Sequence, residues 1–313
     1  NTFFIEPPVA RSESDVLAGT YGGIGVNLSR SVTGQFVLTP FEGSPAMEAG
    51  IRDGDLLVAI DGIPLDLATQ QDVIDQMLRG EVTDGNGVEI TFDGRQGERT
   101  VFIEFDVINV PSVVWRITTE DQSIGYVQIL RFTNRTPAEL EIAVAELSEG
   151  GAAGYIVDVR NNGGGLLQEA IEVASIFLDG GPVLYQVTAN GEQVYNANGG
   201  GSLTEAPLVL LVNGGTASAA ELVAGALQDR GRAILIGQQT YGKGTIQQIF
   251  ALTDASSIHI TSAEWFTPNR EELDGVGLTP DIAMVPDMDG RDVVLGEALR
   301  YLQQLLREVD SQS

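Results

Sequence analysis

The second half of the chain alternates between apolar runs and segments that carry apolar residues at helical spacing. The run Leu208–Val212 is continuously apolar, which indicates a strand buried on both faces of its sheet. Amphipathic helices between such strands predict layered packing, so we expect an α/β core with a mixed sheet. The expected strands are Ile124–Leu130, Gly154–Val159, Leu208–Val212, Ala233–Gly237, Gly244–Leu252 and Ser256–Glu264, and the expected helices are Pro137–Glu149, Leu166–Leu178, Ala217–Gln228 and 291–308.

The first third of the chain has a different pattern, with short alternating strands around one main helix. The segment Gln70–Arg79 is amphipathic and places its apolar residues on one face. The residues before Tyr21 predict an extended lead-in. We therefore expect a lead-in over 1–20, a small domain over 21–108 and the α/β core over 109–313. The strands expected in the small domain are Gly23–Ser29, Gln35–Thr39, Asp55–Ile60, Val88–Phe92 and Thr100–Phe105, with a short helix at Ser44–Gly50.

The chain has a net charge of -27, one histidine and no cysteine. This charge argues against nucleic acid and anionic membrane surfaces as partners, because both require a basic surface. Without cysteine, and with a single histidine, the chain lacks the ligands of the usual zinc sites, so we expect no metal and no cofactor. No apolar run reaches the roughly 18–20 residues that span a bilayer, so we expect no membrane insertion. Because the chain begins at Asn1 and shows no signal peptide, we expect a processed or truncated product.

Lys243 is the only lysine in the chain. The rest of the 17 Lys and Arg residues are arginines. Of these two residue types, only lysine loses its proton near neutral pH when it is buried. Lys243 is therefore a candidate general base, and an ordinary surface lysine is the alternative. The segment Gly237–Gly244 nearly matches a phosphate-binding loop, but Gly244 replaces the hydroxyl that would hold magnesium, and a strand rather than a helix is expected after it.

Ser218 occurs where a buried strand turns on glycines and enters a helix. A serine at this position is usually an N-cap, which is the simpler alternative. The same position offers unpaired backbone N–H groups and the positive end of the helix dipole, which stabilise a developing oxyanion. Ser218 is therefore a candidate nucleophile. A Ser-His-Asp triad built on His259 is another alternative, but its alternating segment predicts a side chain on the polar face of a strand.

The small domain resembles a PDZ domain through the segments Tyr21–Val26 and Ser44–Asp55. Successive glycines let backbone N–H groups converge on an anion, and a strand edge beside a helix accepts a peptide as an extra strand. The resemblance therefore implies that the C-terminal carboxylate of a peptide binds to the glycine loop, with a plain tight turn as the alternative. The residues expected to bind the peptide are Gly22, Gly23, Ile24, Gly25, Val73, Ile74 and Met77.

Several segments together resemble the carboxyl-terminal processing proteases, also called tail-specific proteases. They are Asp158–Gly165, the pair Ser218 and Lys243, Trp265–Pro268 and Gly277–Asp281. The resemblance implies a Ser-Lys dyad in which Ser218 is the nucleophile and Lys243 the base. It also implies an oxyanion hole formed by the N–H groups of Gly164 and Ala219, with Gln247 holding the lysine amine and Glu221 orienting the groups around the dyad.

The expected function is that of a serine endopeptidase that cleaves proteins near their C-terminus, with the PDZ domain recognising the substrate's tail. The expected partners are proteins or peptides with free C-terminal tails. A non-catalytic peptide-binding scaffold of the same fold is the alternative. A trypsin-like PDZ protease is opposed by the α/β pattern and by the single histidine, which follows the serine in the sequence. The resemblance further implies an extracytoplasmic location (periplasm, cell envelope, plastid lumen or secreted) and a possible homo-oligomer.

Overall fold

The computed structural model describes residues 2–7, 14, 17–66, 68–285, 287 and 290–310. Residues 1, 8–13 and 15–16 of the expected lead-in lie outside these ranges. The chain divides into two compact units, one formed by Asn1–Gly19 with Pro111–Ser313 and the other by Thr20–Val110.

The larger unit contains a six-stranded sheet in the order β10-β11-β12-β15-β16-β19. The strands from β11 to β19 run parallel to their neighbours, and β10 runs antiparallel to β11. The expectation of a mixed sheet in an α/β core is therefore confirmed. The bounds are β10 Val113–Ile117, β11 Ile124–Ile129, β12 Gly154–Asp158, β15 Leu208–Val212, β16 Ile234–Gly237 and β19 Ile282–Ala283.

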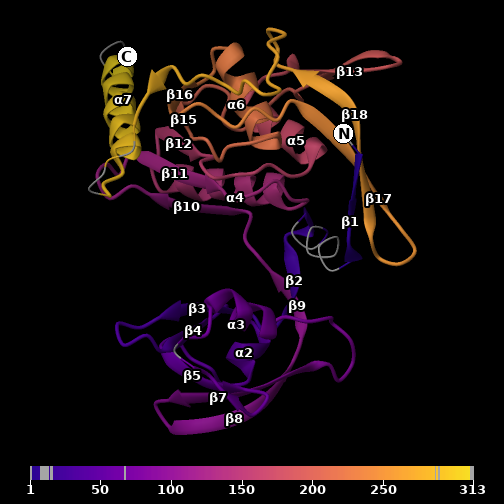
Figure 1. The fold of residues 1–313 in the computed structure, drawn as a ribbon. Helices are drawn as coiled ribbons and strands as arrows, with labels where there is room; N and C mark the ends of the chain where they lie inside the picture. The colour runs from indigo at the N-terminus through magenta and orange to yellow at the C-terminus, as the bar shows by residue number, and fades with distance from the viewer. Residues whose placement is uncertain are drawn as a thin grey trace. The chain divides into compact units, whose positions relative to one another are not determined.

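Helices cover both faces of this sheet (Figure 1). Three of them, α4, α5 and α6, share one hydrophobic core with alternate residues of the strands, whereas α7 shares a second core with the remaining residues. In β12, for example, Val157 belongs to the first core and Ile156 to the second. This explains why β15 is apolar along its whole length. The bounds are α4 Thr136–Glu149, α5 Leu167–Phe177, α6 Ala219–Asp229 and α7 Val293–Asp310.

A second sheet of the larger unit contains the strands β1, β18, β13 and β14 in that order, and β17 also pairs with β18. Part of the expected lead-in is thus a strand, because β1 pairs antiparallel with β18. The β17–β18 hairpin extends from this sheet beside β1 (Figure 1). The bounds are β1 Thr2–Ile5, β13 Pro182–Thr188, β14 Gly191–Asn196, β17 Thr245–Ala251 and β18 Ser257–Phe266.

The smaller unit consists of short strands around one main helix, as its sequence predicts. Its sheet has the order β3-β4-β5-β7-β8, with β6 added to β5, and a two-stranded sheet joins β2 to β9. Its core is lined by buried Phe36, Leu38, Ile74 and Phe92. The bounds are β2 Thr20–Gly23, β3 Val26–Arg30, β4 Phe36–Pro40, α2 Pro45–Glu48, β5 Asp55–Ile60, β6 Ile63–Pro64, α3 Gln71–Met77, β7 Gly87–Gly94, β8 Gly97–Glu104 and β9 Asp106–Asn109.

Candidate active site

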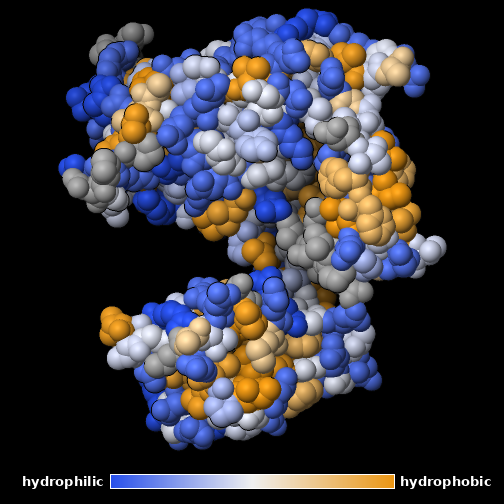
Figure 2. Space-filling view, in the orientation of Figure 1, coloured by the Kyte–Doolittle hydropathy of each residue, from blue (hydrophilic) through white to orange (hydrophobic). Residues whose placement is uncertain are grey.

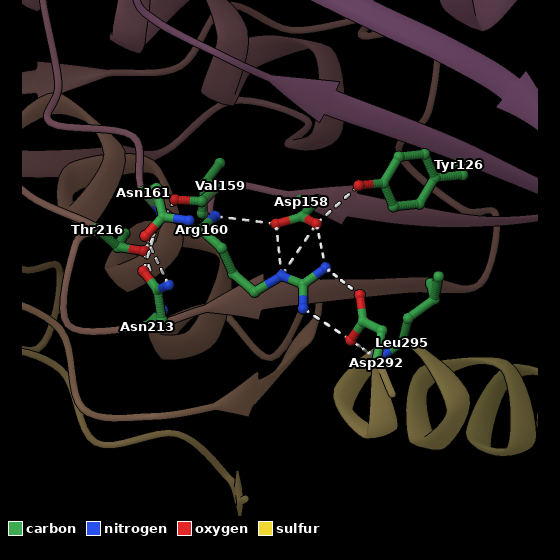
Figure 3. Close-up of polar contacts among 9 residues, drawn as sticks. All are labelled: Tyr126, Asp158, Val159, Arg160, Asn161, Asn213, Thr216, Asp292 and Leu295. Atoms are coloured by element: carbon green, nitrogen blue, oxygen red, sulfur yellow. Dashed lines mark hydrogen bonds and ion pairs between the residues drawn. The ribbon is translucent and has the colours of Figure 1, made fainter. Parts of the chain in front are cut away.

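The turns that follow β12 and β15 are locked to each other (Figure 3). The Asn161 N–H donates to Asn213 Oδ1, and Asn213 Nδ2 donates to Asn161 Oδ1, each over 2.9 Å. Thr216 Oγ1 donates to the carbonyl oxygen of Val159 over 2.8 Å. Since β12 and β15 are neighbouring parallel strands, both turns lie at the same edge of the sheet. This interlock fixes the start of α6 against the glycine-rich turn.

Ser218 precedes α6 in an unusual backbone conformation. Its φ is 56° and its ψ is -119°, a region that residues with a side chain rarely adopt. Such a conformation costs about 1–3 kcal/mol and is found where a functional site imposes it. An ordinary N-cap has an extended backbone, as Ser44 before α2 does at φ -78° and ψ 157°. Capping alone therefore does not explain Ser218, whereas a strained strand-to-helix turn is a known way of exposing a nucleophilic serine.

The fully buried carboxylate of Glu221 joins the serine segment to the lysine segment. Its Oε2 accepts hydrogen bonds from the N–H groups of Ser218 and Lys243, each over 2.9 Å. Its Oε1 accepts one from Gly242 N–H over 2.7 Å and one from Thr240 Oγ1 over 2.5 Å. Because the backbone nitrogens of Ser218 and Lys243 both lie 2.9 Å from the same Oε2, they are at most twice 2.9 Å apart. All four partners are donors, so Glu221 serves only as an acceptor.

The two glycines beside Lys243 are required by close backbone packing. Gly242 has a φ of 85°, and a Cβ on it would stand 2.8 Å from the Gly277 nitrogen. A Cβ on Gly244 would stand 2.6 Å from the Asp274 nitrogen. The turn around residues 273–277 thus packs directly on the lysine segment and fixes its backbone.

The side chain of Lys243 is half-buried. Its carbonyl oxygen accepts a hydrogen bond from Trp265 Nε1 over 3.2 Å. Among the described residues, no hydrogen bond joins the Lys243 amine to the Ser218 hydroxyl or to the Gln247 amide. The structure thus brings the backbones of the expected dyad together, while the expected contact between their side chains is not formed in this conformation. Gln247 lies in β17, opposite Thr261 of β18.

The residues expected to form the oxyanion hole lie next to Ser218, but one of the two N–H groups is already used. A Cβ on Gly164 would stand 2.8 Å from Ser218 Cβ and 3.0 Å from the Ala219 nitrogen. The Gly164 N–H, however, donates to Asn162 Oδ1 over 2.9 Å. Because Asn162 is buried and also donates to the Ile129 carbonyl over 2.7 Å, it is firmly held. In this conformation Ala219 supplies an N–H group without a partner among the described residues, and Gly164 does not.

An ionic network ties the end of β12 to the start of α7 (Figure 3). Arg160 pairs with Asp158 over 2.6 Å and with Asp292 over 2.8 Å, and Tyr126 donates to Asp158 over 2.7 Å. Asp292 also accepts a hydrogen bond from Leu295 N–H in the first turn of α7. Burial alone would lower the pKa of Arg160, but its hydrogen bonds with the two aspartates outweigh burial and raise it. Burial, followed by the charge of Asp158, raises the pKa of Tyr126.

In the smaller unit, the structure corrects one residue expected to bind a peptide. Ile74 is fully buried in the core and is inaccessible to a ligand, because it lies on the inner side of α3. Val73 is 45% exposed, and Met77 is partly buried against the core. Ile24 is also fully buried, and its N–H donates to the Leu78 carbonyl over 3.2 Å. Only Val73 and Met77 of the three expected helix residues therefore remain available to a peptide.

The glycines of the expected carboxylate loop have a packing role. A Cβ on Gly22 would stand 2.1 Å from the carbonyl oxygen of Gly80, and one on Gly23 2.9 Å from that of Leu78. A Cβ on Gly25 would stand 2.5 Å from Ser44 Cβ. These contacts require glycine whether or not a ligand binds, so the glycines by themselves are no evidence of carboxylate binding.

His259 does not have the environment expected of it. It is buried in β18, and its ring stacks on Phe3 of β1 with 4.9 Å between the ring centroids. The prediction of a side chain on a polar face was wrong, because β1 covers this position.

The sequence interpretation missed several residues that build the site. Thr240 receives a hydrogen bond from Leu278 N–H, which leaves its own proton for Glu221. Asn162 and Asn213 fix the two turns. Polar residues directly after buried strands were the available signal. No group of three or more His, Cys, Asp or Glu side chains in the described ranges is arranged to hold a metal. No described helix combines the length and apolarity needed to cross a membrane.

Comparison with known proteins places these features in a family. Residues 123–284 match peptidase family S41, and residues 36–84 match the PDZ domain. The carboxy-terminal-processing protease of Bartonella bacilliformis is 33% identical over 94% of this chain and 69% of its own length. The carboxyl-terminal-processing protease of Synechocystis is 36% identical over 84% of this chain and 62% of its own length.

A solved structure extends the likeness to the fold. The photosystem II D1 C-terminal processing protease is 32% identical, with a TM-score of 0.55 over 92% of this chain and 80% of its own. The match covers segments of both units.

Proposed function

The chain belongs to peptidase family S41, and on this premise we propose that it is a serine endopeptidase that acts near the C-terminal ends of proteins, with Ser218 as nucleophile and Lys243 as general base. The observation that carries this proposal is the buried carboxylate of Glu221. One of its oxygens accepts a hydrogen bond from the backbone of each proposed catalytic residue. Glu221 is thus a positioning residue, which sets the spacing of two segments that are far apart in the sequence.

The proposed reaction begins when the Ser218 hydroxyl oxygen attacks the scissile carbonyl carbon and its proton passes to the Lys243 amine. The carbonyl oxygen, which becomes negatively charged, accepts a hydrogen bond from Ala219 N–H at the start of α6. The C–N bond then breaks, and the Lys243 ammonium returns its proton to the leaving amine. Water, deprotonated by Lys243, hydrolyses the remaining ester on Ser218.

Lys243 acts as a base only through a neutral amine. Its side chain is half-buried in the structure, and a substrate chain lying across the site would cover the exposed part. The lysine side chain would then rotate onto the Ser218 hydroxyl, because the two are not hydrogen-bonded in the present conformation. Gln247 is proposed to hold the amine in that arrangement.

The PDZ domain is proposed to bind the free C-terminal tail of the substrate. Support comes from the outer edge of β3, which pairs only with β4 among the described strands and lies beside α3. Gln71 of α3 donates to the Leu28 carbonyl of this edge over 2.7 Å. A tail adding to β3 would replace this hydrogen bond and contact Val73 and Met77. The location proposed for the enzyme is extracytoplasmic, and its substrates are other proteins.

Digestion of an unfolded protein tests the proposal. We expect cleavage near the C-terminus by the wild-type chain and slower cleavage when the substrate's C-terminus is amidated. Ser218→Ala should abolish cleavage, and Ser148→Ala, at an exposed position of α4, is the control that should retain it. Full activity of Ser218→Ala would refute the assignment of the nucleophile. Equal rates on free and amidated substrates would refute the recognition of the tail but not the assignment of the nucleophile.

A further inference from the structure

The strand β17 (Thr245–Ala251) leaves the candidate active site with one edge unpaired. It begins two residues after Lys243 and pairs along its length with β18. The opposite edge of β18 is occupied by β1 and β13. Within the described ranges, no backbone hydrogen bond reaches the outer edge of β17 between Gln247 and Ala251.

The register shows which backbone groups point to that open edge. Leu252 N–H donates to the Ser256 carbonyl over 2.8 Å, which marks this pair as hydrogen-bonded. Hydrogen-bonded and non-hydrogen-bonded pairs alternate along an antiparallel ladder. The pairs of Phe250 and Gln248 with β18 are therefore hydrogen-bonded. The intervening residues Gln247, Ile249 and Ala251 direct their N–H and C=O groups outward.

This edge carries none of the devices that normally prevent strand addition. Natural edge strands are protected by charged residues, proline or bulges along the exposed side. The segment Thr245–Ala251 contains neither charge nor proline, and its one register shift, between Ile246 and Gln247, precedes the open part. No Asp or Glu occurs between Asp229 and Asp254, although the whole chain carries a net charge of -27. The strand beside the candidate active site is thus free of acidic residues in a very acidic protein.

Apolar side chains flank the same edge on both faces of the sheet. On one face Phe4 and Phe250 lie on either side of Ile258 and are 56% and 47% exposed. On the other face Ile249 is 48% exposed, next to His259. Figure 2 shows the resulting gathering of hydrophobic residues over the β17–β18 hairpin. A strand added here would find apolar neighbours for side chains on both of its faces.

We infer that the outer edge of β17 binds an extended stretch of the polypeptide substrate as an added β-strand and leads it to Ser218. The inference rests on the proposed function and names a binding site for that function. Continuity supports this occupant, because a chain paired along β17 arrives at Lys243. The uncharged strand suits a neutral polypeptide, whereas a second copy of this chain would bring its own net charge of -27.

Binding of an unfolded peptide to the Ser218→Ala variant tests the inference without requiring turnover. The probe is a fluorescein-labelled peptide rich in Val, Thr and Ala, without Asp or Glu, and the measurement is its Kd by fluorescence anisotropy. Ile249→Pro removes one outward N–H, and proline is tolerated at the open side of an edge strand. Ile249→Ala is the matched control, since it removes the exposed side chain and keeps the N–H.

We expect Ile249→Pro to raise the Kd about tenfold, corresponding to roughly 1.4 kcal/mol, and Ile249→Ala to raise it much less. Ala251→Pro blocks the same edge and is the second variant if Ile249→Pro fails to fold. An unchanged Kd in the proline variants would overturn the inference, and so would an equal loss in Ile249→Ala. A wild-type dimer that Ile249→Pro converts to a monomer would also overturn it, because the edge would then join two copies. None of these outcomes depends on whether the wild-type chain is active, so a failure of the proposed function is seen separately.

Discussion

The backbone strain at Ser218 makes a quantitative prediction about stability. At φ 56° and ψ -119° the residue stands where glycine is far more easily accommodated than serine. Relief of the strain is worth about 1–3 kcal/mol, and the extra flexibility of glycine in the unfolded chain offsets about 0.5–1 kcal/mol of it. Ser218→Gly should therefore be more stable than the wild type by up to about 2.5 kcal/mol. The same variant should be inactive, because it lacks the nucleophile.

Urea unfolding followed by tryptophan fluorescence measures this effect on the stability of the larger unit, which contains Ser218. Both tryptophans, Trp115 and Trp265, lie in the larger unit, so their fluorescence reports the unfolding of that unit. A thermal midpoint should rise by about 2–4 °C for each kcal/mol in a unit of this size. At an ordinary N-cap, glycine in place of serine loses a few tenths of a kcal/mol. A Ser218→Gly variant less stable than the wild type would therefore refute the claim that this turn stores strain.

Three further results are expected, each measured by urea unfolding with tryptophan fluorescence. Glu221→Gln should lower the free energy of unfolding by about 2–6 kcal/mol, since the amide nitrogen that replaces one carboxylate oxygen leaves two buried donors without an acceptor. The same variant should also lose cleavage of protein substrates. A stability equal to that of the exposed Glu149→Gln control would contradict this. Gly242→Ala should cost more than about 1 kcal/mol because of its φ of 85° and the close Gly277 nitrogen, whereas Gly214→Ala, whose Cβ would meet nothing nearer than 3.9 Å, should be nearly neutral; equal effects would rule out the packing argument. Burial works to raise the pKa of Asp292, but the hydrogen bonds and charge of Arg160 and the backbone hydrogen bonds at the start of α7 together outweigh burial and lower that pKa. The stabilising contribution of the pair is therefore present above the unfolded pKa of about 3.9 and is lost as the pH falls through the lower folded pKa. The difference in unfolding free energy between wild type and Asp292→Asn should narrow below about pH 4, and a constant difference would contradict the pairing.

The sequence predicted the elements whose burial imposes a clear period. Leu208–Val212 matches β15, and Pro137–Glu149 differs from α4 by one residue, because an apolar run and a helical stripe are both strong signals. The strand β1 and the β13–β14 hairpin were not predicted. β1 is short and is stabilised by pairing with a strand some 250 residues away, which no local pattern reveals. The hairpin strand β14 is largely exposed and has no apolar face to signal it.

For the site, the sequence indicated the chemical groups but not their hydrogen bonds. Ser218 and Lys243 stood out by residue type and spacing. The role of Glu221 as acceptor for both segments depends on a tertiary contact, as does the occupation of the Gly164 N–H by Asn162. The error at Ile74 has a simpler cause. A helical stripe contains both fully buried and half-exposed positions, and periodicity does not distinguish them.

The central claim is that Lys243 activates Ser218, and labelling by a fluorophosphonate tests it most directly. An activated serine oxygen forms a bond to the phosphorus of this reagent, and fluoride leaves. Mass spectrometry then locates the covalent phosphonate on the chain. The wild-type chain should be labelled at Ser218, whereas Lys243→Arg should keep the native tryptophan fluorescence and lose the label, because arginine does not give up its proton near neutral pH. Labelling of Ser218 in Lys243→Arg at the wild-type rate would contradict the account.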